Sequence, residues 1–162
     1  ARVFVLEEQP SWGPHLRSRD RVRKAAKRHF VDPSLAVAAV GANADRLLRD
    51  LDYFGQVFES LVVRDLRVYA DVHDAIVHHY RDSAGREVDA IIERRDGSWI
   101  AVEVKLAASR EEDAAASLKR FAANLDTART EPPSAMIIIT GGQYGYTRAD
   151  GIHVIPIGAL AA

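Results

Sequence analysis

The apolar residues of this 162-residue chain recur with the spacings of helices and strands. Over 45–69 they return every three or four residues, which predicts one long amphipathic helix with a single inward stripe. The members of this stripe are Leu47, Leu48, Leu51, Phe54, Phe58, Leu61, Val62 and Leu66. The same spacing predicts a second helix over 111–125. A shorter helix begins at Asp32-Pro33, an N-cap followed by the proline that suits a first helical position.

Runs of β-branched and aromatic residues, bounded by turn residues, predict strands between and after these helices. The predicted strands cover 3–6, 29–31, 76–81, 86–95, 99–106, 134–140 and 152–157. A helix, three antiparallel strands, a second helix and two further strands together predict an α/β fold with a central mixed β-sheet flanked by helices. We expect an N-terminal segment at 1–44, with a short strand and helix, followed by the core of the fold at 45–162.

Composition narrows the possibilities only slightly. A net charge of −1 gives the whole chain no electrostatic attraction to nucleic acid, so any positive surface must be local. The basic run over 17–28 is either a solvated segment or a surface for phosphate or for an acidic partner. The absence of cysteine excludes disulfides and cysteine-based zinc sites and favours the cytoplasm. We find neither a membrane-spanning apolar run nor a signal peptide, and the start at Ala1 suggests a piece of a longer protein.

Charged residues interrupt two strands that are otherwise apolar. Asp89 lies in Val88-Asp89-Ala90-Ile91-Ile92, and Glu103 and Lys105 lie in Val102-Glu103-Val104-Lys105. Burying an unpaired charge costs several kcal/mol, so the centre of a strand normally excludes one. Two acids and a lysine converging there are explained by a shared hard cation, Mg²⁺ or Mn²⁺, for which the Val104 carbonyl could supply another oxygen. The alternative is a structural salt-bridge cluster inside the sheet.

The register of the hairpin decides whether these acids can meet. A two-residue Asp96-Gly97 loop would pair Asp89 with Val104, which would put Asp89 and Glu103 on opposite faces of the sheet. We therefore predict a three-residue loop or a bulge, for which Gly97 is suited.

Glu59 is the candidate from the long helix. It lies beside the inward stripe, with Val62, Val63 and Leu66 three, four and seven residues on. A carboxylate there needs a partner, which a metal or Lys105 would provide. A half-buried structural glutamate is the alternative. Glu87 fits an exposed strand face, and Lys119 and Arg120 could line a nucleic-acid groove or a solvated helix face.

A helical Glu, a strand Asp and a following Glu-x-Lys resemble the signature of the PD-(D/E)XK nuclease superfamily, although Val88 stands where that motif has proline. The chain also resembles the narrower family DUF4143, found at the C-terminal end of bacterial AAA-type ATPases. This second resemblance rests on Phe30 to Leu35, Phe58-Glu59-Ser60, Tyr80 to Asp89, and Glu103-Val104-Lys105. It implies a restriction-endonuclease-like core and a missing ATPase half, since the phosphate loop of such ATPases does not occur here.

Together these observations predict a metal-dependent nuclease domain that hydrolyses phosphodiester bonds. In it Glu59, Asp89 and Glu103, with the Val104 carbonyl, bind Mg²⁺ or Mn²⁺, and Lys105 assists hydrolysis. The expected partners are nucleic acid, with DNA favoured, and the ATPase domain of the same full-length chain. The alternative is a non-catalytic module that docks DNA or protein and regulates the ATPase.

Overall fold

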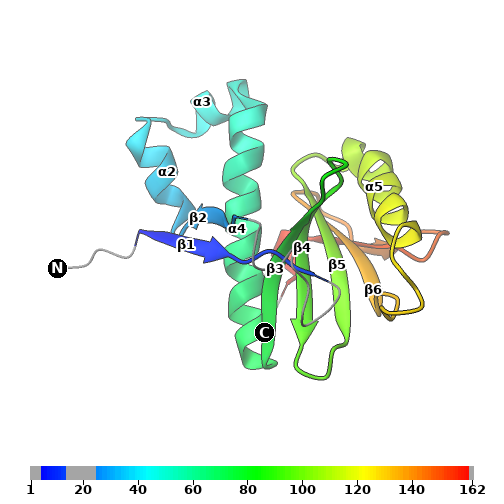
Figure 1. Cartoon of the computed structure of the whole chain (residues 1–162). Coiled ribbons are helices and arrows are strands. Elements are labelled where there is room, and N and C mark those ends of the chain that lie inside the picture. The colour runs from blue at the N-terminus through cyan, green and yellow to red at the C-terminus, as the bar shows by residue number, and fades with distance from the viewer. Residues whose placement is uncertain (1–4, 14–24, 161–162) are drawn as a thin grey trace.

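The protein, seen in a computed structural model that describes residues 5–13 and 25–160, consists of a mixed sheet between helices (Figure 1). Helix α4 (Leu51–Val72) covers one face of the sheet and helix α5 (Glu111–Ala123) covers the other. This confirms the fold class predicted from the order of elements. Within the described ranges, no helix combines the length and the apolar content needed to cross a membrane.

The main sheet has six strands in the order β3-β4-β5-β6-β8-β7. Their bounds are β3 Ala75–Arg81, β4 Glu87–Arg94, β5 Trp99–Lys105, β6 Ala135–Thr140, β7 Tyr146–Thr147 and β8 His153–Pro156. Strands β3, β4 and β5 are antiparallel, as predicted, whereas β6 runs parallel to both β5 and β8. The short strand β7 pairs antiparallel with β8 and was not predicted. The 3₁₀ helices η1 (Ala108–Arg110) and η2 (Ile157–Ala159) follow β5 and β8.

The N-terminal part forms a small two-stranded sheet, in which β1 (Leu6–Gln9) pairs antiparallel with β2 (Lys27–Phe30). Helix α2 (Pro33–Ala39) begins as predicted, with the Asp32 side chain accepting a hydrogen bond of 2.9 Å from the Ser34 N–H. Half of the predicted strand at 3–6, and most of the basic run at 17–28, lie outside the described residues.

The single helix predicted over 45–69 is wrong in one respect, because the structure divides it at Asp50. Helix α3 (Ala44–Arg49) ends there and α4 begins, with the Asp50 side chain accepting from the Tyr53 N–H at 3.0 Å. Asp50 adopts φ −127° and ψ 78°, so the helix axis changes direction and the apolar stripe is interrupted. Leu48 and Leu51 are consequently 62% and 60% exposed rather than inward.

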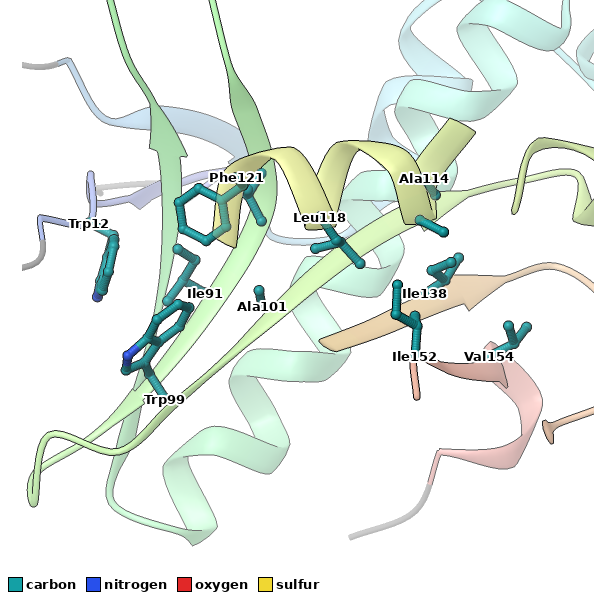
Figure 2. Close-up of a cluster of buried hydrophobic side chains, with 12 residues drawn as sticks. Trp12, Ile91, Trp99, Ala101, Ala114, Leu118, Phe121, Ile138, Ile152 and Val154 are labelled. Carbon is teal, nitrogen blue, oxygen red and sulfur yellow. The ribbon is translucent and has the colours of Figure 1, made fainter. Parts of the chain in front are cut away.

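Apolar side chains form one cluster on each face of the sheet. Figure 2 shows the cluster under α5, where Leu118 and Phe121 point down onto the strands and the indoles of Trp12 and Trp99 lie beside them. The two indole ring centroids are 4.8 Å apart, and both side chains are buried, so the two tryptophans pack as part of the core. Each large side chain buried in this way contributes about 2 kcal/mol, so the two clusters fix how α4 and α5 lie against β4 and β5.

Candidate metal site between β4 and β5

The β4–β5 hairpin has the three-residue loop that the sequence predicted. Glu93 pairs with Trp99, and the Arg94 N–H donates to the Ser98 carbonyl at 2.9 Å. The loop between them therefore consists of the three residues 95–97. Gly97 has a φ of +85°, in the left-handed region that such a loop requires and that glycine adopts without strain. Continuing this register puts Asp89 and Glu103 opposite one another on the α5 face of the sheet.

Asp89 lies in a β-bulge. Between two flanking backbone pairs, β4 has one residue more than β3, so Asp89 and Ala90 together face His79. The Gln9 side chain completes the interrupted ladder, since its Nε2 donates to the carbonyls of His78 at 2.9 Å and of Asp89 at 3.0 Å. Bulges of this kind redirect one side chain, and here the redirected side chain is the Asp89 carboxylate.

A buried polar chain runs from Gln9 to helix α4. The Gln9 Oε1 lies 3.0 Å from His29 Nε2, and His29 Nδ1 lies 3.1 Å from Ser60 Oγ. Because Gln9 donates through its amide nitrogen, its oxygen must accept, so His29 carries its proton on Nε2 and accepts from Ser60. Burial, followed by the nearby charges of Lys27 and Arg67, lowers the pKa of His29 to about 4, which keeps this imidazole neutral.

The predicted acid-acid-lysine set does converge. Lys105 Nζ lies 2.8 Å from Glu103 Oε2 and 3.7 Å from Asp89 Oδ2. The Val104 N–H donates to Asp89 Oδ2 at 2.8 Å, and the Ser117 hydroxyl of α5 donates to Glu103 Oε1 at 3.2 Å. Both carboxylates therefore face one point beneath α5, with a single ammonium group between them.

Burial and a neighbouring negative charge disfavour the ionised form of Glu103. Burial, followed by the negative charge of Asp89, raises the pKa of Glu103 to about 7, although Lys105 and Ser117 act in the opposite direction. Burial by itself lowers the pKa of Lys105, but the charges of Asp89 and Glu103 outweigh it and the pKa is raised. Lys105 thus stays charged, and one ammonium does not fully neutralise the two acids.

Glu59 reaches this region from α4, but its close contact is a different lysine. Lys27 Nζ, from β2, lies 2.5 Å from Glu59 Oε1 and 3.5 Å from Glu87 Oε1. Burial, then the charge of Asp89, raises the pKa of Glu59, and Lys27 opposes this shift. Burial by itself lowers the pKa of Lys27, but its pairing with Glu59 and the charges of Asp89 and Glu87 raise it overall.

The donor set suits a hard cation held by few protein ligands. Mg²⁺ commonly binds through one or two carboxylates and keeps several waters, which Asp89 and Glu103 would allow, with the Val104 carbonyl as a further oxygen. In the described part of the chain, no group of three or more His, Asp or Glu side chains is close enough together to hold an ion. Four carboxylates and two lysines gather here, so the fully ionised cluster has two negative charges that a dication would balance.

The site opens into a cavity of about 320 Å³ between the β3–β4 turn and α5. Its lining comprises Ala84, Gly85, Arg86, Glu87, Asp89, Glu103, Lys105, Ser117 and Arg120. Arg120 therefore lies at the rim, whereas its neighbour Lys119 pairs with Asp150 at 2.8 Å. A larger groove of about 1130 Å³ lies around the β4–β5 loop at the other end of the hairpin, away from the paired carboxylates. We assign the candidate site to the smaller cavity because the two acids and Lys105 line it, although its volume is lower.

Sequence reasoning missed several residues of this region. Lys27 was grouped with the basic run and Glu87 with an exposed strand face, yet the two form an ion pair at the site. The available signal was spacing, because Lys27 is two residues from the buried His29 and shares its face in a strand. Nothing local marked Gln9 or Ser117, whose contacts lie 80 and 14 residues away along the chain.

Comparisons with known proteins give one family and one distant structural likeness. The family model described as "Domain of unknown function (DUF4143)" matches residues 54–160. No curated protein matches the chain. A solved half-complex from a tetradecameric assembly of Thermococcus gammatolerans McrB AAA+ hexamers with bound McrC contains a chain similar at 10% identity, with a TM-score of 0.43. That match covers 63% of this chain and only 27% of the other.

Proposed function

Because the chain belongs to the DUF4143 family, a family of unknown function, we propose its activity from the site itself: metal-dependent hydrolysis of phosphodiester bonds in nucleic acid. The observation that supports this most strongly is the convergence of Asp89 and Glu103 on one point, with Lys105 between them. A scaffold has no need for a buried Glu103 carboxylate whose ionisation is disfavoured beside a second acid, whereas a dication bound to both carboxylates would stabilise their charged forms. The proposal places the chain among PD-(D/E)XK nucleases.

In this proposal Asp89 and Glu103 hold one Mg²⁺ or Mn²⁺, with the Val104 carbonyl as a third oxygen. The bound ion would polarise a phosphoryl oxygen and lower the pKa of a bound water. Lys105 remains protonated, so its ammonium can offset charge on the pentavalent phosphate. Ser117 fixes the orientation of Glu103, and Arg120 at the rim of the cavity is placed to pair with a flanking phosphate.

The proposal includes a partner. The family resemblance implies an ATPase module in the same full-length chain, and such a module would move or load the nucleic acid. DNA is the favoured substrate. Glu59, which the sequence suggested as a third metal ligand, forms an ion pair with Lys27 instead.

One observation favours a second function, a non-catalytic docking module. The whole chain carries a net charge of −1, and the site itself holds more carboxylates than lysines, so without a metal it repels phosphate. Such a module would bind protein or DNA through other surfaces and would not cut.

The two functions are separated by cleavage assays on single-stranded, duplex and branched DNA and on RNA, with Mg²⁺, with Mn²⁺ and with EDTA. We expect cleavage that requires the metal and is lost in Asp89→Ala and Lys105→Ala. Lys119→Ala is the matched control. Lys119 lies on α5 beside the cavity but does not line it, and it pairs with Asp150. The ATPase-containing full-length protein should be tested in parallel with the domain.

The outcome against the nuclease is equally definite. Nucleic-acid binding without cleavage in the full-length protein, unchanged by Asp89→Ala, would favour the docking module. Cleavage that persists in both site variants would show that the activity arises elsewhere.

A further inference from the structure

A second cation-like position lies beside the proposed metal site, and Lys27 fills it. Its ammonium reaches from β2 to two carboxylates on different elements, Glu59 of α4 at 2.5 Å and Glu87 of β4 at 3.5 Å. The side chains of Lys27 and Glu59 are 30% and 21% exposed, so the pair is largely shielded from water. An ammonium held between two carboxylates occupies the kind of position that a divalent cation would otherwise take.

The two lysines divide the four acids between them. Lys105 contacts Asp89 and Glu103, whereas Lys27 contacts Glu59 and Glu87. Asp89 lies between the two pairs, since its charge acts on both lysines and on both Glu59 and Glu103. The cluster is therefore continuous, and removing the Lys27 charge would leave a second group of carboxylates without a cation.

Resting on the proposed function, we infer that Lys27 is a built-in cation that keeps Glu59 and Glu87 from binding a divalent ion, so that the site takes one such ion on Asp89 and Glu103. Lys27 is tethered to the fold, so it competes for these carboxylates at a high effective concentration. A site with one ion then depends on Lys105, and not on a second metal, to offset charge on the phosphate.

The test is the number of Mn²⁺ ions bound per chain, measured by the electron paramagnetic resonance signal of free Mn²⁺ during titration. Wild type should bind one ion. Lys27→Met, which keeps the side-chain length but not the charge, should bind one ion more than wild type. Lys27→Arg keeps the charge and should match wild type, and Lys27→Met combined with Glu59→Gln should lose the extra ion. Lys27→Gln, which can still hydrogen-bond to Glu59, replaces Lys27→Met if the latter does not fold.

The outcomes separate this inference from the proposed function. Equal stoichiometry in wild type and the uncharged Lys27 variants overturns the inference, and a value of one ion in both leaves the Asp89 and Glu103 site intact. Two ions in wild type also overturn it. No ion in wild type and one in Lys27→Met would support the exclusion by Lys27 while refuting the proposed metal site. An extra ion that survives Glu59→Gln contradicts the assignment of the carboxylates.

Discussion

Replacing Glu103 with glutamine should make the protein more stable at neutral pH in the absence of metal, and the gain should disappear in acid. Glu103 is 4% exposed, and burial together with the charge of Asp89 raises its pKa to about 7 from an ordinary value of 4.5. The folded state therefore binds the Glu103 proton more tightly than the unfolded state. Stability from this proton is complete below pH 4.5 and is lost as the pH rises to about 7.

The size of the effect follows from the shift. Each pKa unit corresponds to about 1.4 kcal/mol, so the change from 4.5 to about 7 predicts a loss of about 3 kcal/mol in wild type. Glutamine is neutral at every pH and keeps the shape of the side chain. Relative to wild type, Glu103→Gln should therefore gain about 3 kcal/mol of unfolding free energy between pH 4.5 and pH 7.5. The low pKa of His29 acts on both proteins alike and cancels in the difference.

The assay is urea unfolding in EDTA at constant ionic strength across this pH range. The buried indoles of Trp12 and Trp99 provide a fluorescence signal. Glu112→Gln is the matched control, since the pairing of Glu112 with Arg148 lowers the pKa of that exposed carboxylate. Its difference from wild type should not grow in the same direction over this pH range. Repeating the series with Mg²⁺ about 100-fold above its dissociation constant should stabilise wild type by about 3 kcal/mol and offset the difference.

Two results would refute the reasoning. Parallel stability curves for wild type and Glu103→Gln would mean that neither burial nor the charge of Asp89 disfavours ionisation of Glu103 in the folded state. A variant that becomes less stable than wild type as the pH rises would mean that Lys105 more than neutralises the pair. If the two stability curves diverge in EDTA and Mg²⁺ does not reduce the difference, the raised pKa of Glu103 is supported but metal binding at this site is contradicted.

Three further predictions test the elements that position the site, each by urea unfolding. Gln9→Glu should cost about 3 kcal/mol, because a carboxylate cannot donate to the two carbonyls that the amide now satisfies, whereas the exposed Gln56→Glu should change stability by less than about 0.5 kcal/mol. Gly97→Ala should cost about 1 kcal/mol through its positive φ alone, since an added Cβ meets nothing within 4 Å; an unchanged midpoint would contradict the loop. Leu48→Ala should cost less than about 0.5 kcal/mol and Leu66→Ala at least 2 kcal/mol; equal losses would restore the single inward stripe.

The N-terminal segment belongs to the site more closely than the predicted boundary at residue 45 suggests. Lys27 supplies one of the two ammonium groups, and the Gln9 to His29 chain bridges the bulge at Asp89. The matched family region, 54–160, contains the acids but not these supporting residues. Truncation to the matched region would therefore remove the partner of Glu59 and leave the bulge without its amide.

The sequence by itself determined the features that depend on neighbouring residues. Periodicity located the helices and strands, Asp32-Pro33 marked the start of α2, and charges inside apolar strands marked Asp89, Glu103 and Lys105. Even the loop at Gly97 could be inferred, because alternation along a strand fixes which register lets two acids share a face.

Only the tertiary structure decided which lysine each acid contacts and how the bulge is held. On sequence grounds the partner of Glu59 was a metal or Lys105, whereas the packing of β2 against α4 brings Lys27 to it. The Asp50 break was also hidden, because a capping side chain and a continuing helix fit the same apolar spacing. The physical reason is common to these cases. Pairings between residues tens of positions apart depend on how whole elements pack, which local propensity and spacing do not encode.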